Sequence, residues 1–412
     1  MKTNDKIRIE IAADILGISK KNVFSWAKKE GIPIAKDVDD PAFIKIEDLK
    51  NQEGFQFLFS KNWFQEEETS TPLRNYSCAE LFAGCGGLAL GLERAGFETV
   101  FLNELDKHAC NTLRQNRPNW NVIEGDVGSL NFNQFKGKID LLSGGFPCQA
   151  FSYAGKKLGF EDVRGTLFFE FARAIKEIEP KIVLAENVRG LLSHDKGRTL
   201  ETISGIFREL GYHLLEPKVL KAMFFRVPQK RERLILIAVR IDLWREDCFQ
   251  FPSPFPKIFN LRDALVAGEL YNADVPDSEG QTYPKRKREI MSHVPPGGYW
   301  RDLPEGLQKE YMLKSFYLGG GKTGMARRLS WDEPSLTLTC APAQKQTERC
   351  HPSETRPLTT REYARIQTFP DEWEFRGSSG QVYKQIGNAV PVNFGYALGR
   401  SLVRCLNQIE SS

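Results

Sequence analysis

The sequence lacks the features that mark membrane and secreted proteins. No apolar run approaches the roughly 18–20 residues that a membrane-spanning helix needs. Residues 1–6 lead into no apolar segment of the kind that secretory signals contain. We therefore expect a cytoplasmic protein that has no membrane partner.

Cysteine and histidine are too scattered for a structural metal site. The eight cysteines form no Cys-x-x-Cys pair, and the five histidines form no cluster with them, so no metal is expected. In a reducing compartment, scattered cysteines are mostly buried thiols. A cysteine with a special role must therefore be identified by its surroundings.

The chain also has little excess charge. Its formal net charge of +4 is weak evidence for a nucleic-acid partner. Its length of 412 residues suits two or three domains, and its hydrophobic fraction of 41% is typical of globular proteins. Basic residues gather locally, although each cluster could also be a solvated surface. These clusters are Lys230, Arg231 and Arg233, residues 285–288, and Arg327 with Arg328.

The first fifty residues have the pattern of a small separate domain. A short helix over residues 12–16 is closed by Gly17, and Ser19 can cap a second helix that runs to about Lys29. Two short helices joined by a glycine-containing turn form a helix-turn-helix pattern. Residues 1–50 thus resemble excisionase-like and MerR-like winged helix-turn-helix domains, which implies operator DNA as a partner. A purely structural helical hairpin is the alternative.

From residue 76 onward, short apolar strands alternate with helices. This alternation predicts an α/β fold with a doubly wound, mainly parallel sheet. One long stretch, rich in proline, glycine and aromatic residues, breaks the alternation and predicts an inserted irregular domain. The predicted parts are a linker over 51–75, an α/β domain over 76–240, the insert over 241–357 and a return to the α/β domain over 358–412.

A glycine-rich loop follows the first of these strands. The loop Phe82-Ala83-Gly84-Cys85-Gly86-Gly87 allows a ligand to approach the backbone closely. Glu104 ends the next strand, where a carboxylate can accept hydrogen bonds from two ribose hydroxyls, and Asp126 ends a third. This spacing predicts a nucleoside cofactor and leaves NAD and S-adenosylmethionine open, although the incomplete Gly-x-Gly-x-x-Gly pattern disfavours NAD. A glycine-rich turn without a ligand is the alternative.

One cysteine stands out by its position. Cys148 follows the strand predicted over residues 139–143, so it lies at the carboxyl edge of the sheet, where ligands bind in open α/β folds. Its neighbours are glycine, proline and glutamine, which is not the packing of a core thiol. Cys148 is therefore a candidate nucleophile.

The segment Gly145-Phe146-Pro147-Cys148-Gln149-Ala150-Phe151-Ser152 resembles the active-site loop of the DNA (cytosine-5) methyltransferases of bacterial restriction-modification systems. Other motifs of that family occur in the same order within residues 76–412. They are residues 82–87, 164–169, 186–188, 229–233, 361–370 and 385–391. So many segments in the family's order leave little room for coincidence.

The resemblance implies S-adenosyl-L-methionine as the cofactor and the Rossmann-like fold of the methyltransferases that use it. Glu104 is expected to bind the ribose and Asp126 the adenine amino group. The full set of expected cofactor residues is Phe82, Ala83, Gly84, Gly86, Gly87, Glu104, Leu105, Asp126, Pro147, Asn388 and Ala389.

The resemblance also implies covalent catalysis. Cytosine C5 is a poor nucleophile, and a Cys148 thiolate that adds to C6 makes C5 reactive. Glu186 would hydrogen-bond to N3 of the base or protonate it. Arg233 would contact the carbonyl oxygen of the base, and Arg231 would position the loop or a phosphate.

The implied substrate is double-stranded DNA, bound by a monomer that flips the target cytosine out of the helix. The insert over 241–357 occupies the family's target-recognition position, and Arg327 or Arg328 is the preferred reader of a base. The residues expected at DNA are Gln149, Ser152, Arg327, Arg328, Thr337 and Leu338, with Gln344, Lys345, Gln346 and Arg349 as further candidates. A restriction endonuclease is the expected genetic partner.

Two other functions stay open. The family's transfer-RNA-directed branch shares the Pro-Cys-Gln loop, so RNA cytosine-5 methylation is possible, although the long insert and the N-terminal module favour DNA. The module over residues 1–50 could also add transcriptional regulation to the enzymatic activity.

Overall fold

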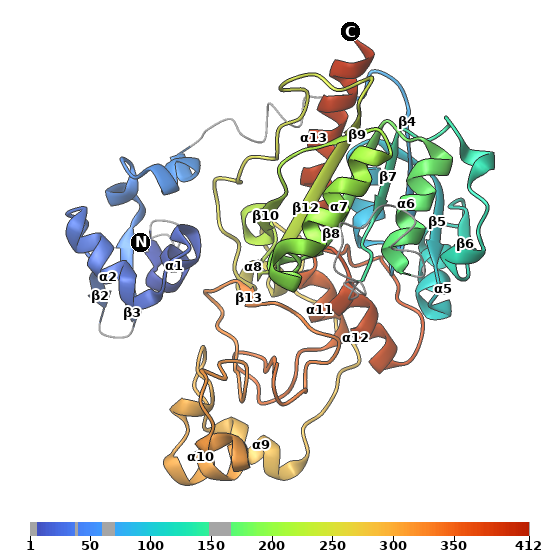
Figure 1. Cartoon of the computed structure of the whole chain (residues 1–412). Helices are drawn as coiled ribbons and strands as arrows, with labels where there is room; N and C mark the ends of the chain where they lie inside the picture. Colours follow the sequence, from blue (N-terminus) through green and yellow to red (C-terminus); the bar gives the residue numbers. More distant parts are fainter. Residues whose placement is uncertain (1–5, 38–39, 60–70, 148–165, 412) are drawn as a thin grey trace. The chain divides into compact units, whose positions relative to one another are not determined.

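The computed structural model describes residues 6–37, 40–59, 71–147 and 166–411. They form two compact units, which are labelled by element in Figure 1. The first comprises the chain up to Thr69 together with Ser253–Ile258. The second comprises Ser70–Pro252 and Phe259–Ser412. Part of the expected insert, Ser253–Ile258, therefore groups with the first unit.

The described part of the first unit contains two α-helices and a three-stranded antiparallel sheet of order β1-β3-β2. Helix α1 ends at Gly17, whose φ is 69°, and the Ser19 hydroxyl accepts a hydrogen bond from Asn22 N at 3.3 Å at the start of α2. Helix α2 lies where the sequence predicts it, and α1 ends at the predicted residue but begins three residues earlier than predicted, at Ile9. The elements are β1 (Lys6–Arg8), α1 (Ile9–Leu16), α2 (Lys20–Lys29), β2 (Ala35–Asp37), β3 (Asp40–Lys45), and the 3-10 helices η1 (Ile46–Leu49) and η2 (Glu53–Phe59).

The beginning of the predicted linker is part of this unit. Helix η2 carries Phe55, which is fully buried and whose ring centroid lies 5.7 Å from that of Trp26. The apolar contact explains why residues 53–59 belong to the folded unit, where the composition alone predicted a linker from residue 51.

A mixed sheet lies at the centre of the second unit. Among the described residues it has eight strands, in the order β10-β12-β8-β7-β4-β5-β6 with β9 also paired to β12. Strands β4 to β8 pair in parallel, whereas β12 is antiparallel to its three neighbours, as the mainly parallel prediction allows. The strands are β4 (Tyr76–Leu81), β5 (Phe97–Glu104), β6 (Val122–Glu124), β7 (Leu141–Gly144), β8 (Ile182–Val188), β9 (Tyr212–Leu214), β10 (Lys218–Lys221) and β12 (Glu232–Arg240).

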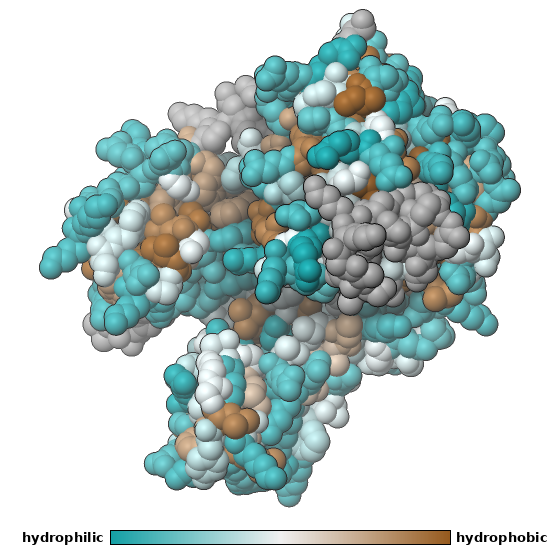
Figure 2. Space-filling view, in the orientation of Figure 1, coloured by the Kyte–Doolittle hydropathy of each residue, from teal (hydrophilic) through white to brown (hydrophobic). Residues whose placement is uncertain are grey.

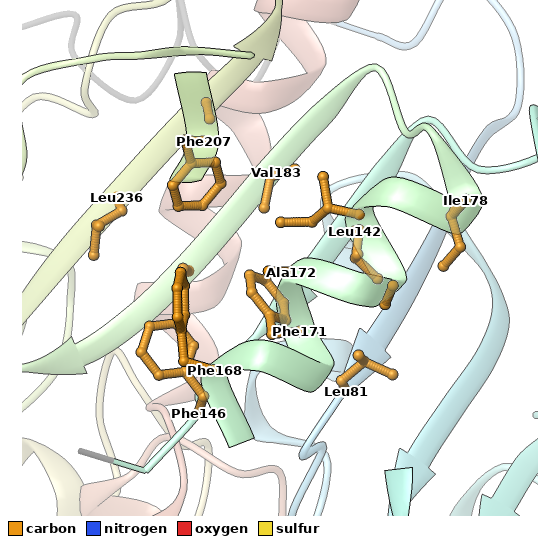
Figure 3. Close-up of a cluster of buried hydrophobic side chains, with 14 of the residues drawn as sticks. Leu81, Leu142, Phe146, Phe168, Phe171, Ala172, Ile178, Val183, Phe207 and Leu236 are labelled. Atoms are coloured by element: carbon orange, nitrogen blue, oxygen red, sulfur yellow. The ribbon is translucent and has the colours of Figure 1, made fainter. Parts of the chain in front are cut away.

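Helices cover both faces of this sheet, which is why its strands are nearly continuous apolar runs. On one face, α6 (Leu167–Ile178) and α7 (Arg198–Glu209) enclose the aromatic core drawn in Figure 3. On the other face, α4 (Gly87–Arg94) packs against α13 (Val392–Glu410). A Cβ on Gly91 would lie 2.6 Å from Val392 O, so only glycine permits this approach.

Residues 283–350, which we call the insert lobe, have a separate small core that includes Trp300, Met312 and Met325. Strand β13 (Ser335–Leu336) pairs in parallel with β11 (Gln229–Lys230) and so joins the lobe to the basic motif. The other α-helices are α5 (Lys107–Asn116), α8 (Leu261–Leu265), α9 (Lys285–Ser292), α10 (Glu305–Met312), α11 (Thr360–Ile366) and α12 (Ser379–Asn388). The remaining 3-10 helices are η3 (Val127–Ser129), η4 (Asn133–Phe135), η6 (Arg189–Leu192), η7 (His194–Gly197), η8 (Ala222–Phe224), η9 (Trp300–Asp302) and η10 (Leu313–Tyr317).

Within the described ranges, every helix is too short or too polar to cross a lipid bilayer. Figure 2 shows that hydrophilic side chains predominate on the face of the molecule in view.

Candidate active site

The glycine loop follows β4 and turns into α4 at the carboxyl edge of the sheet. Gly84 and Gly86 have φ values of 55° and 87°, which favour glycine, and Phe82 takes the same left-handed region at 59°. A Cβ on Gly87 would lie 2.1 Å from Val390 O. The loop and the last motif, which contains Asn388 and Ala389, are therefore in close contact.

Glu104, at the end of β5, is held by backbone N–H groups on both sides of its carboxylate. Its Oε2 accepts from Gly84 N at 2.7 Å, and its Oε1 accepts from Leu105 N at 2.9 Å and Asp106 N at 2.8 Å. These bonds fix the carboxylate at the glycine loop and leave acceptor capacity on Oε2. The neighbouring Leu105 is 71% exposed, so it presents an apolar side chain to solvent beside Glu104.

The structure also describes three other residues that the sequence predicts at the cofactor. Asp126 is exposed and accepts from Gly128 N at 2.9 Å. The Asn388 side chain is exposed and its Oδ1 accepts from the Cys340 thiol at 3.2 Å. Pro147 is exposed and ends the described part of its loop. The predicted residues Cys148, Gln149 and Ser152 lie outside the described residues.

Glu186 and Arg233 form an ion pair at the same edge of the sheet. Glu186 is on β8 and Arg233 on β12, and the side chains are only 13% and 14% exposed. A Cβ on Gly145 would lie 3.2 Å from Glu186 Oε2, and Asn187 Nδ2 donates to Phe146 O at 2.9 Å. These contacts hold the start of the Cys148 loop beside the Glu186 carboxylate.

Arg231 points into the protein. It is 1% exposed, and its guanidinium donates to Gly387 O at 3.1 Å and Asn388 O at 3.4 Å. Burial, with the positive charge of Arg233 nearby, lowers its pKa to about 9. This geometry suits a residue that positions the last motif, and does not suit contact with a phosphate.

The residues predicted to bind DNA separate into buried and accessible groups. Arg328 is 4% exposed, and its guanidinium donates to the Val294, His351, Glu354 and Met291 carbonyls and to the Thr355 hydroxyl. Arg327 is half-buried over the Tyr299 ring at 5.9 Å from its centroid, and its Nε has no hydrogen-bond partner among the described residues. The guanidinium of Arg328 is thus fully occupied by acceptors within the protein, whereas that of Arg327 is not, although its Nε is buried.

The predicted Thr337-Leu338 element is tied to the basic motif. The Thr337 hydroxyl donates to Lys230 O at 2.7 Å, and Leu338 is 2% exposed with its N–H bonded to Gln229 Oε1 at 3.0 Å. The Arg349 guanidinium, also buried, donates to Thr337 O at 3.1 Å. These side chains hold the segment in place and do not themselves offer free donors to DNA.

Two features of the site were missed in the sequence. Glu80 on β4 is 4% exposed, its Oε2 has no partner among the described residues, and burial with the nearby Glu104 and Glu186 raises its pKa well above the usual value. A charged residue near the end of an apolar strand was the available signal. The second feature, a buried hydrogen bond between Gln229 and Gln367, joins segments too far apart in sequence to be paired by inspection.

Comparison with known proteins gives a consistent result. The model of the C-5 cytosine-specific DNA methylase family matches residues 76–404. The type II methyltransferase M.Eco47II of Escherichia coli is 65% identical over 98% of this chain and 97% of its own length. M.PspPI of Psychrobacter sp. (strain TA137) is 63% identical over 96% of this chain and 95% of its own length. M.Sau96I of Staphylococcus aureus is 53% identical over 82% of this chain and 78% of its own length.

The fold also matches a solved structure. The S. pombe Dnmt2 methyltransferase superposes with a TM-score of 0.57 over 81% of this chain and 100% of its own, at 18% identity. At that identity the likeness concerns the fold alone.

Proposed function

Because this chain belongs to the C-5 cytosine-specific DNA methylase family, we propose that it methylates a flipped-out cytosine through a covalent bond between Cys148 and C6. The chain is a type II DNA cytosine-5 methyltransferase that acts on a specific sequence. The observation that carries the mechanism is the Glu186–Arg233 pair beside Gly145, three residues before Cys148.

The reaction divides among three side chains. The Cys148 thiolate adds to C6, which makes C5 electron-rich, and loss of the C5 proton later allows the thiolate to leave. Glu186 hydrogen-bonds to N3 or protonates it, and so takes up the negative charge that the thiolate delivers. Arg233 orients the Glu186 carboxylate and can donate to the carbonyl oxygen of the base.

The residues of the glycine loop fit S-adenosylmethionine, which supplies an electrophilic methyl group when bound. The Glu104 carboxylate, held at the glycine loop with acceptor capacity left on Oε2, would accept a hydrogen bond from the ribose. Phe82, Ala83, Gly84, Gly86 and Gly87 would line the cofactor together with Leu105, Asp126, Pro147, Asn388 and Ala389.

For DNA recognition we favour Arg327 over Arg328 as the reader of a base, because the guanidinium of Arg328 is already saturated by the protein. Gln149 and Ser152 would contact DNA from the Cys148 loop. Thr337 and Leu338 would act by shaping the backbone of their segment. The enzyme would work as a monomer in the cytoplasm and protect DNA from a cognate restriction endonuclease.

The test is bisulfite sequencing of DNA from cells that express the protein, with Cys148→Ser as the control. A single sequence context protected from conversion only by the wild-type chain is expected. Transfer of labelled methyl groups to transfer RNA but not to duplex DNA would instead support the RNA alternative.

The first unit supports a second function, the binding of operator DNA. Helix α2 contains no acidic residue and exposes Lys21, Ser25 and Lys28 along one face, and the antiparallel strands β2 and β3 would serve as the wing. Lysines along a helix face are the usual electrostatic contact to phosphates. The alignment with M.Eco47II covers 98% of this chain, so that relative has most of this unit as well.

Operator binding is tested with the full-length chain by footprinting its own upstream promoter. Protection that disappears in Lys21→Ala/Lys28→Ala, while methylation is retained, is the expected outcome. An identical footprint from the double variant would remove the proposal.

A further inference from the structure

Two glutamines are completely buried where the insert lobe meets the basic motif. Gln229 is on β11, two residues before Arg231, and Gln367 follows α11; both are 0% exposed. Buried amides are unusual because their donors and acceptors must all be satisfied inside the protein. Their partners therefore indicate what the pair holds together.

The hydrogen bonds run in one direction through both amides. Gln367 Nε2 donates to Ile386 O at 2.7 Å and to Ala389 O at 3.1 Å. Carbonyls only accept, so the amide of Gln367 is fixed with its oxygen toward Gln229 Nε2, which donates to it at 2.9 Å. The orientation of Gln229 is then fixed too, with its Oε1 accepting from Leu338 N at 3.0 Å.

This chain of bonds connects three parts of the proposed site. Leu338 belongs to the recognition segment, Gln229 to the motif that carries Arg231 and Arg233, and Ala389 to the last motif. Other contacts converge at the same point. The Thr337 hydroxyl bonds to Lys230 O, and a Cβ on Gly387 would lie 2.4 Å from Thr339 O.

A buried amide pair is not needed merely to fill this space. Apolar side chains of similar volume fill a core at least as well, whereas a pair of oriented amides defines one arrangement of the segments around it. The direction of this series of hydrogen bonds is the informative property. It allows a single register between the recognition segment and the strand that continues to Arg233.

We propose that Gln229 and Gln367 are positioning residues that hold the recognition segment in register with the basic motif, so that a cytosine delivered by the bound DNA meets Glu186 and Arg233. The proposal rests on the proposed function, because it assumes that the segment around Thr337 carries the DNA. It predicts that breaking the amide chain disturbs the alignment of the base more than the binding of either ligand.

The experiment compares Gln229→Leu and Gln367→Leu with Gln308→Leu. Gln308 lies on α10 and donates to Arg301 O and Leu303 O. Its loss therefore removes two hydrogen bonds within the lobe and leaves the Gln229–Gln367 pair, which we call the joint, unchanged. The DNA is a duplex of the sequence found by bisulfite sequencing, with 2-aminopurine at the target position, whose fluorescence rises when the base leaves the stack. Affinities for DNA and S-adenosylmethionine and the single-turnover rate are measured on the same proteins with the unmodified duplex, which keeps the target cytosine.

Both joint variants should bind DNA and cofactor within about threefold of the wild type, while the single-turnover rate falls about tenfold or more. The fluorescence rise should be reduced in both and unchanged in Gln308→Leu. The single-turnover rate of the double variant should be no lower than that of either single variant, since each substitution breaks the same series of hydrogen bonds. If a leucine variant fails to fold, the unbranched Gln229→Met and Gln367→Met replace it.

Gln229→Glu tests the direction of the chain. A carboxylate still accepts from Leu338 N but cannot donate to Gln367 Oε1, so this variant should lose as much rate as Gln229→Leu. Wild-type fluorescence and rate in the joint variants would overturn the proposal while leaving the enzyme's function intact. Failure of the wild-type chain to methylate cytosine C5 would instead remove the proposed function.

Discussion

In the central sheet, the site carboxylates Glu104 and Glu186 lie near the carboxyl ends of apolar strands, whereas in the insert lobe charged side chains are part of the interior. Glu104 and Glu186 are oriented at the sheet edge by backbone N–H groups and by Arg233. Arg328 is buried and donates to four carbonyls and a hydroxyl. In the lobe, an arginine side chain thus provides the cross-links that regular backbone pairing provides in the sheet.

The difference teaches how the two regions can serve different purposes. A sheet with paired strands fixes its reactive groups through the backbone, so many apolar sequences can provide the same edge. A lobe held by individual polar side chains depends on particular residues. Substitutions should therefore affect chemistry at the sheet edge and folding or recognition in the lobe.

The largest effect is expected at the sheet edge. Glu186→Gln keeps the shape and removes the proton donor and acceptor properties of the carboxylate, so the single-turnover rate should fall on the order of 10²–10⁴-fold. Calorimetric unfolding should be nearly unchanged. A rate within about threefold of the wild type would show that the charge on the base is managed elsewhere.

In the lobe, the two adjacent arginines should give opposite results. Arg328→Met leaves several buried carbonyls without donors and should lower the free energy of unfolding by about 3 kcal/mol. Arg327→Met should leave stability nearly intact and relax discrimination at one base pair by about 1–3 kcal/mol. Urea unfolding and methylation of single-mismatch duplexes measure the two. Equal destabilisation by both variants would contradict the assignment of a structural role to Arg328 and a recognition role to Arg327.

Glu80 is the exception that sharpens the comparison, because it places an ionisable group inside the sheet region. Its folded-state pKa is raised, so the folded protein retains the proton and loses stability as pH rises from the unfolded pKa to the folded one. Glu80→Gln should remove this loss, which amounts to about 1.4 kcal/mol for every pH unit that separates the two pKa values. The substitution should therefore raise the free energy of unfolding more at pH 8 than at pH 4, and urea unfolding at the two pH values measures this. A pH-independent difference would contradict a buried neutral carboxyl group.

The smallest effect is expected at the joint between the two regions. Thr337→Val removes the hydroxyl that bonds to Lys230 O and should cost about 1 kcal/mol of stability. Thermal unfolding measures this cost. A destabilisation as large as that of Arg328→Met would mean that the lobe depends on the joint for its folding.

The sequence predicted the sheet well because its strands and helices have clear periodicity and its glycine loop and Glu104 stand at fixed spacing. It also predicted the helices that meet at Gly17. It could not predict the fate of Arg328, since the carbonyls that bind it come from backbone that is irregular and distant in sequence. Nor could it pair Gln229 with Gln367, because a buried amide has the same letter as an exposed one.

The most direct test of the covalent mechanism uses duplex DNA with 5-fluorocytosine at the target position. Fluorine at C5 blocks the loss of a proton that releases the thiolate, so the wild-type chain with S-adenosylmethionine should form a denaturation-resistant DNA adduct that maps to Cys148. Cys148→Ser should form none. An adduct at another residue, or wild-type methylation of ordinary DNA without any adduct on the fluorinated duplex, would contradict the mechanism.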